Sequence, residues 1–116
     1  MLVNKICGQK DVKEFFLSRD LNHFCCGCYS CLKKREVCPF WKKKEILINA
    51  VLWADVIIFT TPNYCMMPSA SLKAFFDLFF TNWMSHKPYG ELFSKKAVVI
   101  STAAGVGAKK SGGSLQ

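Results

Sequence analysis

The chain has no long uninterrupted apolar segment, which disfavours a helix that crosses a membrane. None of its apolar runs reaches the roughly eighteen residues that such a helix needs. The longest candidate, Ala70–Trp83, is interrupted by Lys73 and Asp77. Residues Met1–Gly8 also lack the basic stretch and long apolar stretch of a secretory signal peptide. We therefore expect a cytoplasmic protein that has no membrane partner.

Acidic residues are few: Asp and Glu total 8, against 16 Lys and Arg, and the net charge is +8. The basic residues are dispersed, apart from the dense clusters Lys33–Arg35 and Lys42–Lys44. No arginine-rich pattern or nucleic-acid-binding motif accompanies these clusters, so a nucleic-acid partner is disfavoured. The surplus positive charge favours a solvated face, or attraction to anionic partners and nucleotides.

Internal repeats and long low-complexity segments are also missing. Hydrophobic residues make up 51% of the chain and aromatic residues 14%, which is enough to build a core and argues against disorder. A length of 116 residues allows one domain at most. We predict a single domain over residues 1–116, with a cysteine-rich loop at residues 22–41.

Cysteine, in contrast, is abundant, with seven residues. Four of them form the pattern C-x2-C-x2-C-x6-C, and we call these the motif cysteines: Cys25, Cys28, Cys31 and Cys38. Thiolates at such short spacings can converge on one soft centre without long-range folding, which suits an iron–sulfur cluster or zinc. Cys26 is adjacent to a predicted ligand, so we expect its side chain to point elsewhere.

Other interpretations of the cysteines stay open. A secreted disulfide framework is disfavoured by the odd count and by the missing signal peptide. Inert thiols or a metal-free redox pair are compatible with the sequence, because free cysteine often packs as a small hydrophobe. We expect Cys7 and Cys65, which lie outside the motif, to pack in that way. Zinc ligands usually separate into two pairs, unlike these four. The iron–sulfur interpretation leads.

The rest of the sequence alternates helix and strand. Helical spacing predicts inward-facing stripes, which are core-forming, at Ile46, Leu47, Ala50, Val51 and Ala54 and at Leu72, Phe75, Phe76, Phe79, Phe80 and Trp83. The apolar runs within Asp55–Thr60 and Lys96–Thr102 are typical of strands buried on both faces. Pro62 is expected to end the first of these strands. Periodicity and apolar runs predict, in order, a helix end at Met1–Cys7, a strand at Val12–Leu17, a helix at Lys43–Ala54, a strand at Asp55–Thr60, a helix at Ser69–Trp83 and a strand at Lys96–Thr102. This alternation predicts an α/β protein with a parallel sheet.

Two loops leave the carboxyl ends of these strands, where open parallel sheets bind their ligands. Thr61–Met67 offers a rigid proline, an amide side chain and an aromatic ring. Ser101–Gly107 offers small residues that let the backbone approach a flat ligand closely. Each loop alone is a weak indication, but their combination with the cysteine motif is more specific.

Three passages carry a resemblance to a known family: Asp20–Leu21 leading into the cysteine motif, Ala54–Tyr64 continuing to Ser69–Asp77, and Lys95–Gly105. Together they resemble the flavodoxin-like NAD(P)H-dependent FMN reductases, and especially the iron–sulfur flavoproteins. The second passage is similar to the strand, flavin loop and following helix of that family.

The resemblance implies a flavodoxin-like three-layer fold with a parallel sheet and FMN at the strand ends. It also implies a [4Fe-4S] cluster on the motif cysteines that relays electrons to FMN, with NAD(P)H as electron donor. The ring of the flavin would contact what we call the flavin-side residues: Pro62, Asn63, Tyr64, Cys65, Ala103 and Gly105. A redox partner protein or a small molecule would accept the electrons. We expect a homo-oligomer and assign no catalytic residue.

The sequence also departs from the family. A first strand with a Ser/Arg-containing phosphate loop and a final strand are not found, so we expect a fold incomplete at both ends. Either the chain is a fragment, which we favour, or another chain fills the gap. Phe40–Lys44 replaces the usual acidic pair after the last cysteine. Without the phosphate loop, we expect weak flavin binding that does not distinguish FMN from riboflavin. The alternative functions are a non-catalytic metal-binding module and an inactive fragment.

Overall fold

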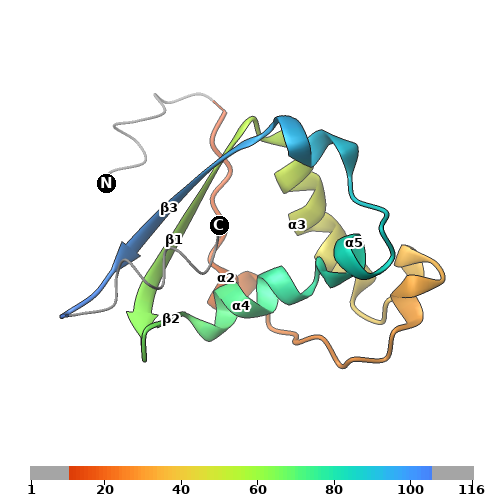
Figure 1. Cartoon of the computed structure of the whole chain (residues 1–116), viewed down its shortest axis with the longest axis horizontal. Helices are drawn as coiled ribbons and strands as arrows, with labels where there is room; N and C mark the ends of the chain where they lie inside the picture. Colours follow the sequence, from red (N-terminus) through yellow and green to blue (C-terminus); the bar gives the residue numbers. More distant parts are fainter. Residues whose placement is uncertain (1–10, 106–116) are drawn as a thin grey trace.

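The computed structural model describes residues 11–105, in which short helices lie beside a small mixed sheet (Figure 1). The elements in chain order are α2 (Leu17–Asp20), η1 (Ser30–Leu32), η2 (Arg35–Val37), α3 (Trp41–Trp53), β1 (Val56–Tyr64), β2 (Met67–Pro68), α4 (Ala70–Asp77), α5 (Phe80–Met84), η3 (Gly90–Ser94) and β3 (Lys96–Thr102). The predicted helix end at Met1–Cys7 lies outside the described residues. Within those residues, no helix combines the length and the apolar composition that crossing a bilayer requires.

The sheet has the strand order β2-β1-β3. β1 and β3 are parallel, in a register that runs from Val56 opposite Lys96 to Pro62 opposite Thr102. The predicted parallel pairing is therefore confirmed. Because both strands run the same way, their carboxyl ends meet at one end of the sheet (Figure 1).

Pro62 does not end β1, contrary to the prediction from sequence, because the strand continues to Tyr64 and turns into a hairpin with β2. Before Asn63, β1 pairs with β3 only, so one of its edges is free of ladder bonds among the described residues. A proline fits a strand when its missing N–H group faces such an edge. Cys65 and Met66 form the turn with φ angles of 51° and 63°, as a type I′ hairpin turn requires.

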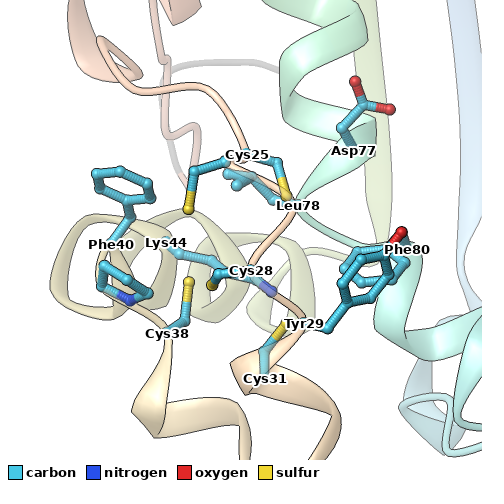
Figure 2. A pocket seen from close by; sticks show the side chains of 12 residues that line it. Cys25, Cys28, Tyr29, Cys31, Cys38, Phe40, Lys44, Asp77, Leu78 and Phe80 are labelled. Carbon is cyan, nitrogen blue, oxygen red and sulfur yellow. The ribbon is translucent and has the colours of Figure 1, made fainter.

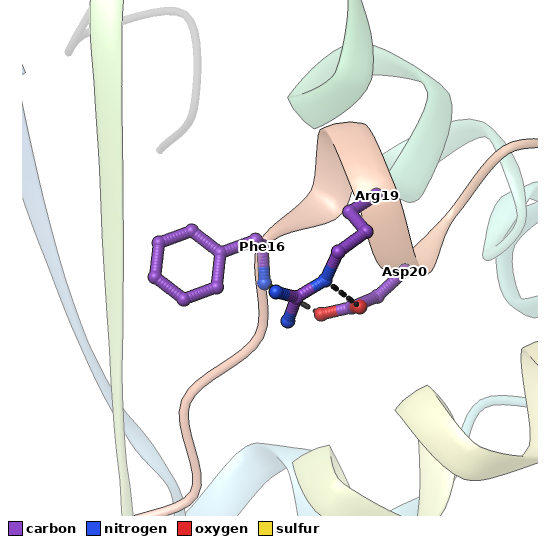
Figure 3. A network of polar contacts seen from close by, with 3 residues as sticks. All are labelled: Phe16, Arg19 and Asp20. Carbon is purple, nitrogen blue, oxygen red and sulfur yellow. Dashed lines mark hydrogen bonds and ion pairs between the residues drawn. The ribbon is translucent and has the colours of Figure 1, made fainter.

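The predicted strand at Val12–Leu17 is wrong. Residues 12–16 have no regular structure, and Leu17–Asp20 forms the helix α2. A strand needs a ladder partner, and the sheet of the described residues offers none to this segment. Local bonds form instead: the Asp20 carboxylate accepts the Phe16 N–H at 2.7 Å and the Arg19 Nε–H at 3.0 Å (Figure 3).

The core lies between one face of β1 and the helices α2, α3 and α4. Phe59 of β1 packs against Phe75 and Phe76 of α4, with ring centroids 5.9 and 5.2 Å apart. The buried cluster consists of Leu21, Leu47, Leu72, Ala74, Phe75 and Leu78, with Leu17, Val51, Phe59, Phe76 and Phe79 packed around it. The opposite face of the sheet is more open, since Val56 is 50% and Val98 46% exposed. The prediction that both strands are buried on both faces is therefore wrong for this chain.

α3 matches the predicted helix, but its buried stripe is rotated. Leu47 is buried and Val51 packs on the core as predicted, whereas Ile46 is 61% exposed. Ile48 and Lys44 take the inward positions instead. At its other end, α3 is fixed by the Lys95 ammonium, which donates to the carbonyl oxygens of Leu52 and Ala54, both at 2.6 Å.

The predicted helix at Ser69–Trp83 is interrupted after Asp77. The Leu78 N–H bonds to the carbonyls of both Ala74 and Phe75, and the Phe79 N–H bonds to Phe76. Such i→i−3 bonds tighten the last turn and end α4, and α5 begins at Phe80. The break separates α4, which packs on the sheet, from α5, which packs on the cysteine loop.

Candidate functional site

The cysteine motif lies in a loop that two 3-10 turns shape. η1 packs against η2 and against α5, and η2 also contacts α3. Gly27 and Tyr29 have positive φ angles of 65° and 55°, which bend the loop between Cys26 and Ser30. The Tyr29 ring then meets Phe80 of α5 edge-on, with centroids 5.9 Å apart. These contacts hold the loop against the end of α4 and the start of α5.

The motif cysteines line one pocket together with residues of α3 and of the α4–α5 junction (Figure 2). The fold therefore brings together the four side chains that the sequence singled out. Cys26 lines the same pocket, so the expectation that its side chain points elsewhere is wrong. All six described cysteines are free thiols. Cys7 lies outside the described residues.

The pocket fits a thiophilic centre in its donor chemistry, because thiolates select zinc and iron–sulfur clusters. Among residues 11–105, no three Cys, His, Asp or Glu side chains form a group that could hold a metal ion. The remaining cavity is about 20 Å³, which leaves room for about one water molecule.

Lys44 lines the same pocket from α3. Its side chain runs from α3 into the pocket and ends among the cysteine side chains (Figure 2). Only 3% of the residue is exposed. Burial lowers the pKa of the Lys44 ammonium, and the thiolates of Cys38 and Cys31 oppose that shift. A charged group thus occupies the position that an apolar residue would normally take.

Two thiols of the pocket have shifted pKa values. The pKa of Cys28 is lowered, mainly by its hydrogen bond with the Ser30 side chain. The pKa of Cys31 is raised, mainly by burial, although the Lys44 charge opposes this. The loop therefore holds one thiol that ionises more easily than ordinary cysteine and one that ionises less easily.

The flavin-side residues lie at the other end of α4, at the carboxyl end of the sheet. Pro62 pairs with Thr102, so the segment after Pro62 and the segment after Thr102 are neighbours in the structure. Tyr64 is 63% exposed, and Gly105 has no atom within 4 Å of where a Cβ would lie. Cys65 is exposed in the hairpin turn, so its predicted role as a packing thiol is wrong. Residues 106 and 107 of the second loop lie outside the described residues.

The chain belongs to the family described as having a flavodoxin-like fold, since the model of that family matches residues 2–115. Among curated proteins, it is similar to an iron–sulfur flavoprotein of Methanocaldococcus jannaschii, with 34% identity over 67 residues. That match covers 58% of this chain and 34% of the relative, so the aligned part spans about a third of the relative's length. No solved structure matches the chain. The family resemblance inferred from sequence is thus confirmed.

Lys44 is a pocket residue that the cysteine spacing does not predict. The missed signal lay in the helical period, because Lys44, Leu47, Ile48 and Val51 follow the i, i+3, i+4, i+7 pattern of an inward face. The predicted stripe of Ile46, Leu47, Ala50, Val51 and Ala54 does not include Lys44. The basic cluster Lys42–Lys44 is therefore divided, with Lys42 and Lys43 exposed and Lys44 buried.

Proposed function

We propose that this chain is part of a flavin-dependent oxidoreductase in which the motif cysteines hold a [4Fe-4S] cluster that exchanges electrons with FMN. The observation that carries the proposal is the gathering of the four motif cysteines in one pocket, at one end of α4. The fold family and the flavoprotein relative support the flavin part of the proposal.

The position of α4 supports communication between the two sites. Its N-terminal end follows the β1–β2 hairpin, where the flavin-side residues lie, and Asp77 and Leu78 at its C-terminal end line the cysteine pocket. A helix of 8 residues is about 12 Å long. The proposed flavin and cluster sites would therefore be separated by roughly the length of this one helix.

In this proposal the protein supplies binding and orientation, while FMN and the cluster supply the two-electron and one-electron chemistry. The flavin-side residues would contact the ring of FMN through the hairpin and the loop after β3. NAD(P)H would donate electrons, and a redox protein or a small molecule would accept them. A homo-oligomer is part of the same proposal.

Anaerobic reconstitution of the full chain with iron, sulfide and FMN tests the proposal. We expect flavin absorption together with a broad iron–sulfur shoulder, and iron and sulfide in the purified protein. Replacing each motif cysteine by alanine should remove the iron. Cys26→Ala is the matched control, because Cys26 lines the same pocket outside the ligand pattern, and this variant should keep the iron.

Two results would contradict the proposal in different ways. A colourless protein that contains zinc would favour the non-catalytic metal-binding module. Loss of iron in Cys26→Ala but not in Cys25→Ala would show that the ligand assignment is wrong, even if a cluster assembles.

A further inference from the structure

Within the part of the chain that the structure describes, Lys44 is a buried cation without a carboxylate partner. Lysine is almost never fully buried unless it is paired, yet Lys44 is 3% exposed. The ion pairs among the described residues join Arg19 to Asp20, Lys34 to Glu36 and Lys73 to Asp77, and none includes Lys44. The ionisable groups that interact electrostatically with Lys44 are the thiols of Cys38, Cys31 and Cys25 and the cationic Arg35.

A buried ammonium without an opposite charge, at the position of Lys44 on α3, destabilises the folded state. Leu47, Ile48 and Val51 show that the same face of α3 is otherwise apolar. Taking an ammonium out of water costs several kcal/mol unless an opposite charge offsets it. A negative charge in the pocket would offset the cost of burying the Lys44 ammonium.

A thiophilic centre supplies that negative charge. Thiolates, not thiols, ligate metals and clusters, and a zinc ion or an iron–sulfur cluster held by four thiolates has a net negative charge. Arg35 is not among the residues that line the pocket, and its guanidinium stacks over the Tyr89 ring at 4.0 Å and donates to the Lys87 carbonyl oxygen. Lys42 and Lys43 are exposed on the same helix. Lys44 is the cation that lines the pocket.

We propose that Lys44 is the internal counter-charge of the cysteine pocket, a positioning residue that strengthens binding of a thiolate-held centre and raises the reduction potential of an iron–sulfur cluster there. This inference rests on the proposed function for the redox effect. The sign follows from charge: reduction adds one electron to the centre, and a nearby ammonium stabilises the more negative form.

The experiment compares Lys44→Met with Lys44→Arg in the full chain, and Lys42→Met serves as a matched control from the exposed side of α3. After cluster reconstitution, a redox titration followed by absorbance should show a lower potential in Lys44→Met. We expect the ratio of reduced to oxidised cluster at a fixed potential to fall about tenfold, which for a one-electron couple is about 59 mV. Lys44→Arg should stay near the wild type, and Lys42→Met should not change.

Co²⁺ binding to the cluster-free protein under anaerobic conditions is an independent measurement. We expect Lys44→Met to bind Co²⁺ about tenfold more weakly than the wild type.

Thermal unfolding of the cluster-free chain is a third measurement. Lys44→Met should raise the unfolding midpoint, because a buried charge is removed. A lower midpoint would overturn the proposal by showing that Lys44 is a structural part of the core.

The outcomes separate the two proposals. A cluster that assembles with the same potential in Lys44→Met and wild type overturns the role of Lys44 and leaves the proposed function standing. Co²⁺ binding that depends on Lys44, without any cluster assembly, supports the proposed role of Lys44 and contradicts the iron–sulfur function. A wild-type chain that binds neither Co²⁺ nor a cluster overturns both proposals.

Discussion

Thr61 is the residue that joins the sheet to the start of α4. It is 2% exposed, and its hydroxyl oxygen accepts the Ser69 N–H at 2.9 Å. The same hydroxyl lies 3.0 Å from the Pro62 carbonyl oxygen, to which it donates. Ser69 occupies the N-cap position, where its own side chain makes no capping bond, and Thr61 ties this residue to the neighbouring strand by accepting its backbone N–H.

Thr61→Val tests this role, because valine keeps the shape and removes the hydroxyl. The Ser69 N–H would lose its acceptor in a half-buried position, and we expect a loss of about 0.5–1.5 kcal/mol in the free energy of unfolding. Urea unfolding measures the change. Thr60→Val is the control: Thr60 is exposed on the same strand, and this variant should change stability by less than about 0.5 kcal/mol.

Asp20 should make the chain sensitive to acid. Its pKa is lowered, first by the hydrogen bond from Arg19 and then by the bond from the Phe16 N–H. A carboxyl group whose pKa is lower in the folded state stabilises the fold above its unfolded pKa of about 3.9, and this stabilisation is lost as the pH falls through the folded value. Urea midpoints between about pH 7 and pH 3 should fall more steeply for the wild type than for Asp20→Asn. Equal slopes would show that Asp20 does not contribute.

The hairpin between β1 and β2 is the element with the clearest backbone strain. Cys65 and Met66 both have positive φ angles, 51° and 63°. Residues with a Cβ are disfavoured there by roughly 1–2 kcal/mol, while Asn-Gly suits a type I′ turn. Strain of this kind is often kept where a loop has a function, and this turn belongs to the flavin-side residues.

Replacing the turn with Asn-Gly, as Cys65→Asn with Met66→Gly, should therefore stabilise the chain by about 1 kcal/mol. The thermal unfolding midpoint would rise. Met67→Gly is the comparison, since Met67 lies one residue further in β2, where glycine should instead destabilise by about 0.5–1 kcal/mol. A midpoint that falls in the Asn-Gly variant would refute the strain argument.

For the whole molecule, stability should depend on one face of the sheet. Phe75 is 4% exposed and contacts Phe59, Phe76 and Phe79, whereas Phe93 is 81% exposed. Phe75→Ala should cost about 3–5 kcal/mol, because it leaves a cavity between β1 and α4. Phe93→Ala should change stability by less than about 0.5 kcal/mol. Chemical denaturation of both variants checks this, and similar losses in the two would contradict the described core.

The local pattern of apolar and polar residues was enough to predict the longer helices and strands of this protein. The alternation of amphipathic and apolar segments predicted α3, β1, α4 and β3, and it predicted that β1 and β3 are parallel. These features follow from side-chain periodicity, which a short stretch of sequence carries by itself. The short cysteine spacing likewise predicted that the motif cysteines would gather in one loop, because their separation along the chain limits their separation in space.

Only the tertiary structure decided the features that depend on distant partners. Residues 12–16 have the apolar composition of a strand but find no partner in the described sheet, so α2 forms next to them instead. β1 passes through Pro62 because β2 folds back beyond it. Lys44 is buried because the cysteine loop, together with the end of α4, covers the face of α3 that carries it. Its charge is visible in the sequence, but its environment exists only once these segments have come together.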